Sequence, residues 1–179
     1  MRKQIKYFKE LLLDATFPRR CAICDSVVLP NEMICERCRP TIKVIVEPTC
    51  MKCGKMLSSQ DDMYCYDCKR TYKYFDRGFA VFEYDYIKTS LYRFKYSKRS
   101  EYSRFYAKLT VSQYGEILKD LGIEVFIPVP IHKRRERKRG YNQAYEYALC
   151  ISKLLDIPVD NKLLIRSVNT APLKRLGAL

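Results

Sequence analysis

The sequence predicts an α/β protein with a small cysteine-rich module at its N-terminus. Eight of its nine cysteines form four C-x-x-C pairs between residues 21 and 68. Further along, the apolar run IEVFIPV at residues 123–129 is followed by a basic segment and then a helical pattern, the element order of parallel α/β folds. We expect three parts: a lead helix at residues 1–18, the cysteine module at 19–70, and an α/β domain at 75–179.

The lead segment has a basic start that could suggest a secretory signal. Its apolar run, LLL, is short and no small-residue cleavage site follows, so a cytoplasmic location is predicted. No apolar run in the chain approaches the roughly 18 residues of a membrane span. Four residues recur at helical spacing: Ile5, Phe8, Leu12 and Ala15. They predict an amphipathic helix packed on the protein, in preference to a helix on a membrane surface.

The four C-x-x-C pairs are typical of structural metal sites. The cysteines are Cys21, Cys24, Cys35, Cys38, Cys50, Cys53, Cys65 and Cys68. A two-residue gap lets both sulfurs of a pair bind one ion, and two pairs complete the four-thiolate shell of structural zinc. We therefore expect two structural Zn²⁺ ions. Disulfides are the alternative, which a reducing compartment disfavours.

The spacing leaves open which pairs share an ion. In a sequential scheme the first two pairs hold one ion and the last two hold the other, whereas a cross-braced scheme alternates the pairs. We predict the sequential scheme, because each group then closes a short loop at a lower cost in chain entropy. The module has little apolar content between its cysteines, so metal removal is expected to unfold it.

The chain is strongly basic, with 34 Lys and Arg against 20 Asp and Glu and a formal charge of +14. Two zinc ions held by eight thiolates would add four negative charges in total, and the net charge of the zinc-bound chain would still be strongly positive. A polyanionic partner is the first expectation, and a merely solvated surface is the alternative.

Residues 72–106 mix aromatic and basic side chains. The basic ones between residues 88 and 108 include Arg93, Lys95 and Arg99, and they face one acid, Glu101. The interleaved rings are Tyr92, Phe94, Tyr96, Tyr102 and Tyr106. Cations that contact phosphates and rings that stack on bases would suit single-stranded nucleic acid. The competing interpretation, which residue statistics favour slightly, places the rings in the core and the cations in solvent.

Three regular elements are expected in the same region and beyond. The run FAVFEY at residues 79–84 predicts a strand, residues 87–92 a helical turn, and residues 100–119 a helix. The run at residues 123–129 predicts a buried strand that ends at Pro128 and Pro130, because proline cannot donate to a sheet ladder.

A loop at residues 131–140 should follow that strand, and it carries six Lys or Arg residues. Apolar spacing then predicts a helix that begins near Asn142. Basic side chains beside the free N–H groups of a helix start form an anion site, so phosphate is the expected ligand. His132 is expected to be an ordinary loop residue, and Cys150 a small core residue.

The stretch PVPIHKRRERKRGYNQA, residues 128–144, closely resembles the signature of the ComF family of competence-associated, phosphoribosyltransferase-like proteins. TFPRRCAIC resembles the start of the family's double zinc ribbon, and FDRGFAVFEYDYIKTSLYRFKY resembles its first strand and following basic segment. The resemblance implies a double zinc ribbon followed by a partial type I phosphoribosyltransferase-like parallel-sheet domain. It also implies a cytoplasmic protein that handles single-stranded DNA in natural transformation.

The resemblance likens the basic loop to a pyrophosphate-binding loop. Its candidate phosphate contacts are Arg134, Arg135, Arg137 and Arg139, with Gly140, Asn142 and Gln143 at the following helix start. Arginine suits the role because its guanidinium group can hold two phosphate oxygens at once. Arg93, Lys95 and Arg99 complete the predicted set of phosphate or DNA contacts.

A second motif of the family, two adjacent acids followed by a Thr-Thr-Gly turn, is not found. The only Asp-Asp is Asp61-Asp62, inside the cysteine module, and Leu173 stands where the family often has Gln after Thr170. No catalytic residue is therefore assigned, and Mg²⁺ and phosphoribosyl pyrophosphate are expected only for an active full-length form. Without a neighbouring strand, the strand at residues 123–129 would leave the isolated chain poorly stable or prone to aggregation.

Three functions follow from these observations. The leading one is a competence protein that handles single-stranded DNA, with partners such as a DNA helicase. The second is a phosphoribosyltransferase enzyme in a full-length form. The third is a zinc-ribbon adaptor whose basic surface binds a protein.

Overall fold

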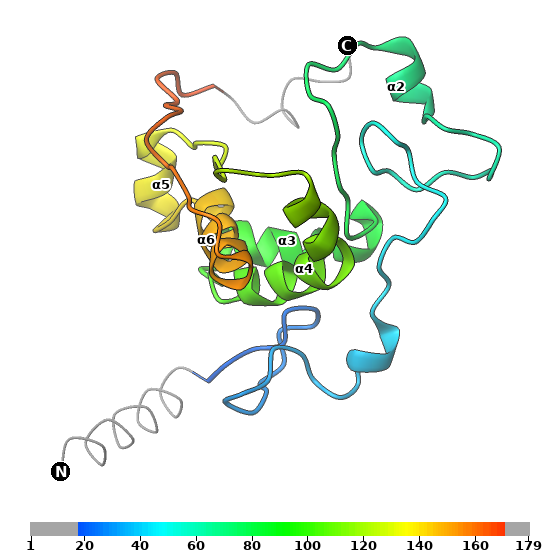
Figure 1. The fold of residues 1–179 in the computed structure, drawn as a ribbon. Coiled ribbons are helices and arrows are strands. Elements are labelled where there is room, and N and C mark those ends of the chain that lie inside the picture. The colour runs from blue at the N-terminus through cyan, green and yellow to red at the C-terminus, as the bar shows by residue number, and fades with distance from the viewer. Residues whose placement is uncertain (1–17, 171–179) are drawn as a thin grey trace. The chain divides into compact units, whose positions relative to one another are not determined.

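The computed structural model describes residues 18–170, which fall into two compact units, Met1–Tyr92 and Arg93–Leu179. The helices, shown in Figure 1, are the 3₁₀ helix η1 (Arg39–Thr41), α2 (Tyr66–Arg70), α3 (Tyr84–Tyr96), α4 (Tyr102–Asp120), α5 (Lys133–Arg139) and α6 (Gln143–Leu155). The boundary between the units falls within α3. All but the last residue of the predicted lead helix, 1–18, lies outside the described residues.

The first unit contains two cysteine loops built on the same backbone pattern. In the first loop, the Cys21 N–H donates to the Ser26 carbonyl at 2.8 Å and the Asp25 N–H donates to the Cys21 carbonyl at 2.9 Å. An antiparallel bridge joins Arg20 to Val27 at the base of this loop. The turn is tight because Asp25 adopts the left-handed conformation, with φ of 67°.

The second loop repeats this arrangement with other residues. The Cys50 N–H donates to the Lys55 carbonyl at 2.8 Å, and the Gly54 N–H donates to the Cys50 carbonyl at 2.8 Å. The bridge at its base joins Thr49 to Met56. Gly54 takes the position of Asp25, with φ of 73°.

Helix α3 begins against the first cysteine loop. Ile87 is 3% exposed, and the buried Ser90 hydroxyl donates to the Ala22 carbonyl. The Tyr86 hydroxyl donates to the Thr41 carbonyl at 3.0 Å. These contacts tie the start of the helix to both ends of the first cysteine group.

The strand predicted at residues 79–84 does not form. The Val81 carbonyl accepts a hydrogen bond from the Ile45 N–H at 2.8 Å, but these residues have no strand assignment and α3 already begins at Tyr84. Residues 87–92, predicted as a single helical turn, lie inside this longer helix. Within residues 18–170, the β-structure consists of isolated bridges.

Helices α4 and α6 pack against each other in the second unit (Figure 1). The buried residues of α4 include Tyr102, Phe105, Ala107 and Leu118, and those of α6 are Ala148, Ile151 and Leu155. Both helices were predicted from the apolar spacing, α4 at residues 100–119 and α6 with its start near Asn142. Asn142 is the N-cap of α6, and its side-chain oxygen accepts from the Ala144 N–H at 3.0 Å.

The strand predicted at residues 123–129 is reduced to one parallel bridge between Phe126 and Val159. The Phe126 N–H donates to the Pro158 carbonyl at 2.8 Å, and the Asp160 N–H donates to the Phe126 carbonyl at 3.0 Å. Pro128 and Pro158 lack N–H groups, so the ladder cannot extend regularly on either side. The described residues therefore do not support the predicted parallel sheet.

The segment predicted as a basic loop is mostly helix α5. His132 caps it, because its Nδ1 accepts from the Arg134 N–H at 3.2 Å, and Gly140 ends it in the left-handed conformation with φ of 93°. Lys and Arg favour helices, and the last turn places cations at the negative end of the helix dipole. His132 thus lies in the loop before the helix, as expected, and it also caps that helix.

None of the helices within residues 18–170 combines the length and the apolar character needed to cross a membrane.

Candidate metal centres and basic surfaces

The first metal centre is formed by Cys21, Cys24, Cys35 and Cys38, whose Sγ atoms all lie within 4.8 Å of one another. The Sγ atoms of Cys24 and Cys35 are 3.6 Å apart. A tetrahedral zinc ion with Zn–S bonds of about 2.3 Å requires sulfurs about 3.8 Å apart. The four thiols therefore fit one zinc ion.

The second metal centre is formed in the same way by Cys50, Cys53, Cys65 and Cys68. Its Sγ atoms also lie within 4.8 Å of one another, with 3.7 Å between Cys53 and Cys65. The structure thus groups the cysteines sequentially, as predicted, and four thiols with no other donor form the closed shell of a structural zinc site.

Backbone hydrogen bonds hold the two halves of each centre together. The Ala22 N–H donates to the Met33 carbonyl at 2.9 Å in the first centre, and the Met51 N–H donates to the Met63 carbonyl at 3.0 Å in the second. Cys21 and Cys50 are almost fully buried by this arrangement. The backbone therefore helps to position the four thiols of each centre for an ion.

The thiols of each centre have opposing pKa shifts. Burial raises the pKa of Cys38, and the neighbouring thiols raise it further. The pKa of Cys24 is lowered to about 6, because hydrogen bonds with Ser26 and with neighbouring thiols outweigh the effect of burial, which raises it. The second centre likewise has a lowered pKa at Cys50, of about 6, and a raised pKa at Cys53. A divalent cation bound by the four sulfurs would lower the pKa of every thiol in the group, because it stabilises all four thiolates.

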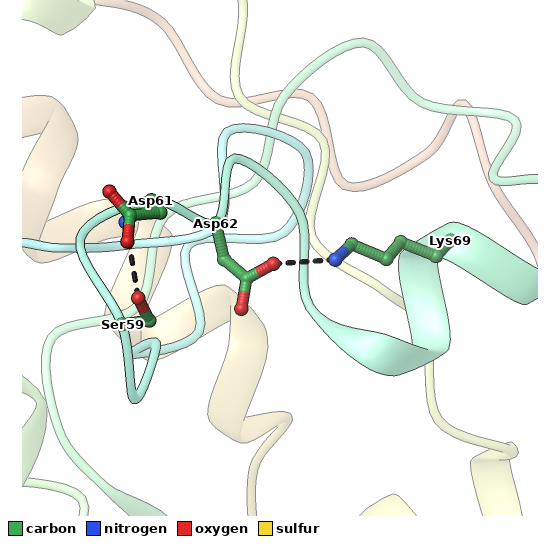
Figure 2. Close-up of polar contacts among 4 residues, drawn as sticks. All are labelled: Ser59, Asp61, Asp62 and Lys69. Atoms are coloured by element: carbon green, nitrogen blue, oxygen red, sulfur yellow. Dashed lines mark hydrogen bonds and ion pairs between the residues drawn. The ribbon is translucent and has the colours of Figure 1, made fainter.

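Asp61 and Asp62, the only adjacent pair of acids, lie in the loop between the two halves of the second centre. Figure 2 shows that Asp62 Oδ1 forms an ion pair with Lys69 Nζ, at 2.5 Å. The Asp61 N–H donates to the Ser59 hydroxyl at 3.2 Å (Figure 2). These contacts link the loop to α2 and close a local turn, so they account for both residues structurally.

The predicted arginine contacts lie on α5 and differ in their surroundings. Arg134 and Arg137 are exposed. Arg135 donates to the Thr170 carbonyl, and Arg139 donates to Gln143 Oε1. Over the described part of the chain, none of the four arginines forms an ion pair with a carboxylate.

Gly140, Asn142 and Gln143 organise the connection from α5 to α6. Gly140 provides the left-handed turn, and the Asn142 side chain donates to the Val129 carbonyl at 3.3 Å while it caps α6. Gln143 accepts from Arg139, whose guanidinium carbon also lies 5.3 Å from the centre of the Tyr96 ring. The structure therefore gives each of these three residues a local contact or turn in this connection.

A cavity of about 300 Å³ opens beside this connection, between α5, the start of α6 and residues 161–166. Its cationic residues are Lys133, Lys162 and Arg166, and Asn142 is the predicted site residue that lines it. These three cations were not among the predicted contact residues. Arg166 also donates to the Thr170 hydroxyl at 2.8 Å.

The aromatic residues at the end of α3 and in the first turns of α4 supply core residues. Phe94, Tyr102 and Tyr106 are buried, and the Phe94 ring lies 5.4 Å from that of Tyr106. Burial raises the pKa of the Tyr141 hydroxyl, and the nearby Arg139 lowers it. Burial has the larger effect, so the pKa is raised to about 12. The cations Arg93, Lys95 and Arg99 are half-buried. For the three buried rings the core interpretation holds, and they offer no surface to a base.

Comparison with known proteins identifies the cysteine-rich part of the chain and two relatives. The double zinc ribbon domain family matches residues 12–69. Competence protein ComFC of Bacillus subtilis is 28% identical over 152 residues, covering 74% of this chain and 62% of the relative. Competence protein F of Haemophilus influenzae is 27% identical over 167 residues, covering 90% of this chain and 72% of the relative.

The chain is similar to competence proteins of the ComF family. It spans 62% of the length of its Bacillus subtilis relative. No solved structure matches it. The double zinc ribbon match covers all eight cysteines of the two centres, so the metal sites and the family resemblance agree.

Proposed function

We propose that this chain has a competence-related role in which it handles incoming single-stranded DNA in the cytoplasm, alongside proteins such as a DNA helicase. The observation that carries the proposal is the cationic surface of α5, which has six Lys or Arg residues and one Glu. The two relatives named as competence proteins support the same role.

Phosphate contacts are the basis of this proposed activity. Arg134 and Arg137 are exposed, and their guanidinium groups are available to phosphate oxygens. Arg135 and Arg139 already bond within the chain, so they position the helix and add charge. Such contacts are independent of base sequence and weaken steeply as salt rises.

The zinc centres have a structural role in this proposal. Their closed four-thiolate shells leave no position for a substrate. We assign residues 19–70 to the double zinc ribbon and residues 75–179 to a phosphoribosyltransferase-like domain, in which the bridge between Phe126 and Val159 would be the start of a parallel sheet.

Fluorescence anisotropy with a labelled single strand across a salt series tests the proposal. Arg134→Ala with Arg137→Ala is expected to reduce the slope of log affinity against log salt by about 1.4, because each phosphate contact contributes about 0.7. The matched control is Lys119→Ala with Lys153→Ala, which removes two exposed cations of the same unit. If the unsubstituted chain fails to bind at low salt, the DNA proposal is wrong and the protein-binding adaptor is favoured.

The cavity beside α5 favours a second candidate, a phosphoribosyltransferase activity in a longer form of the protein. Lys133, Lys162 and Arg166 could neutralise the phosphates of phosphoribosyl pyrophosphate, which would bind with Mg²⁺. Isothermal titration calorimetry with this compound and Mg²⁺ tests it. Lys162→Ala with Arg166→Ala should abolish the binding heat, and an unchanged heat would rule out this cavity as the site.

A further inference from the structure

A second hollow, of about 180 Å³, lies on the second zinc ribbon. We call it the aromatic hollow and define it by the residues that line it: Lys52, Tyr64, Cys68, Lys69, Thr71, Tyr72 and Lys73. Tyr72 is 78% exposed and Tyr64 is 40% exposed. It lies far from α5 in the sequence and was not predicted.

Further rings adjoin the aromatic hollow. The Tyr74 ring meets the Tyr72 ring edge-on, with ring centres 5.1 Å apart, and Tyr74 is 96% exposed. Lys52 Nζ lies 5.6 Å from the centre of the Phe75 ring, which is also exposed. Aromatic rings gathered on a surface cost solvation free energy, and such groups usually mark an interaction site.

The segment that carries these rings is held at both ends by the second ribbon. At one end, the Thr71 N–H donates to the Asp67 carbonyl at 3.0 Å. At the other, the Gly78 N–H donates to the Lys52 carbonyl at 2.7 Å. The backbone that carries Tyr72 and Tyr74 is therefore held in place by the second ribbon, which lowers the entropy cost of binding.

The positive charge of the aromatic hollow comes from its lysines and is partly offset. Within residues 18–170, neither Lys52 nor Lys73 forms an ion pair, whereas Lys69 is paired with Asp62. A zinc ion with four thiolates, one of them from Cys68, would carry a net charge of −2 and offset part of the lysine charge. Ring contacts should therefore contribute more to binding here than phosphate contacts.

We propose that the aromatic hollow is a second contact site for single-stranded DNA, in which unpaired bases stack on Tyr64 and Tyr72 and neighbouring phosphates meet Lys52 and Lys73. This inference rests on the proposed function and names a surface for it. Exposed rings beside cations suit unpaired bases, whose faces are accessible, whereas the bases of a duplex are stacked on one another.

The test is anisotropy of the full, zinc-loaded chain with labelled oligothymidine. Tyr64→Ala with Tyr72→Ala is expected to raise Kd by about 25-fold or more, since each stacked base is worth about fivefold or more and the two factors multiply, while the salt slope stays unchanged. Tyr64→Phe with Tyr72→Phe keeps both rings and should bind within about twofold of the original chain. The matched control is Tyr84→Ala, which removes a 57% exposed ring from the start of α3.

Two results would overturn the inference in different ways. If the original chain binds and the alanine pair binds equally well, the aromatic hollow is not a contact site, but the proposed function stands. If the original chain does not bind oligothymidine at low salt, both proposals fail. Zinc content measured on each variant shows whether the centre is intact.

Photocrosslinking of the unsubstituted chain gives an answer that does not depend on a variant's folding. An oligonucleotide carrying 5-iododeoxyuridine should form adducts on the peptides that contain Tyr64 or Tyr72. Adducts confined to other aromatic residues would contradict the proposed site.

Discussion

The two zinc ribbons share one backbone design and differ at the turn residue after the first cysteine pair. Asp25 and Gly54 both adopt positive φ and both donate to the carbonyl of the first cysteine. A Cβ on Gly54 would lie 2.7 Å from the Gly78 carbonyl oxygen, whereas Asp25 carries a side chain at the equivalent position. The metal site sets the turn, and the neighbouring segment decides which residue can occupy it.

The ribbons also differ in what covers them. The first is tied to α3 through Ser90 and Tyr86. The second presents exposed rings, including Tyr72 and Tyr74. The same metal-binding scaffold thus supports internal packing in one case and an open surface in the other.

Metal removal should have the largest effect and act on both ribbons. Structural zinc contributes about 10–16 kcal/mol in small zinc-binding peptides, and these ribbons have few other stabilising contacts. A chelator should release two zinc ions per chain and remove hydrogen-exchange protection from residues 19–70. Helices α4 and α6, whose core contains none of the ligands, serve as the internal control and should keep their protection.

Gly54→Ala should destabilise the second ribbon alone, by at least about 2 kcal/mol, because it combines a left-handed backbone with a steric clash. Chelator titration followed by hydrogen exchange measures the effect for each ribbon separately. Asp25→Gly is the matched change in the first ribbon and should be close to neutral. If the two substitutions destabilised their ribbons equally, the close approach of Gly78 to Gly54 would not be the cause of the difference between the ribbons.

Ser90→Ala should weaken the first ribbon by about 1–3 kcal/mol. The substitution leaves the buried Ala22 carbonyl without the hydroxyl that it accepts from, and an unsatisfied buried acceptor costs about this much. Hydrogen exchange at residues 20–28 reports the change, and residues 49–57 of the second ribbon provide the control. Faster exchange in both would mean that the ribbons unfold together.

The smallest expected effect concerns Tyr86, whose ionisation should make the stability of the first ribbon depend on pH. Burial raises its pKa above the usual tyrosine value of about 10, so the folded state favours the neutral phenol. The stabilisation is complete below about pH 10 and is lost as the pH rises through the higher folded pKa. Hydrogen exchange of the first ribbon at rising pH checks this, and Tyr86→Phe should remove the dependence.

Local patterns predicted some elements well and others poorly. Cysteine spacing anticipated the two sequential groups, and apolar periodicity anticipated α4 and the Asn142 cap of α6. The basic segment was predicted as a loop, although its Lys and Arg residues favour a helix once His132 and Gly140 cap it. The strand at residues 123–129 failed because prolines near Phe126 limit the ladder.

The candidate surfaces were harder to predict than the metal centres. The rings at residues 94, 102 and 106 and those at residues 72 and 74 look alike in the sequence, yet the first set is buried and the second exposed. Lys133, Lys162 and Arg166 are separated in the chain and meet at one cavity only through the fold.

Sequence alone determined the metal chemistry, the net positive charge and the amphipathic helices, because each depends on spacing or composition within a short stretch. The tertiary structure decided which rings are buried, which arginines are engaged within the chain, and which cations line a cavity. Those properties depend on contacts between distant segments, and no local pattern of residues encodes them.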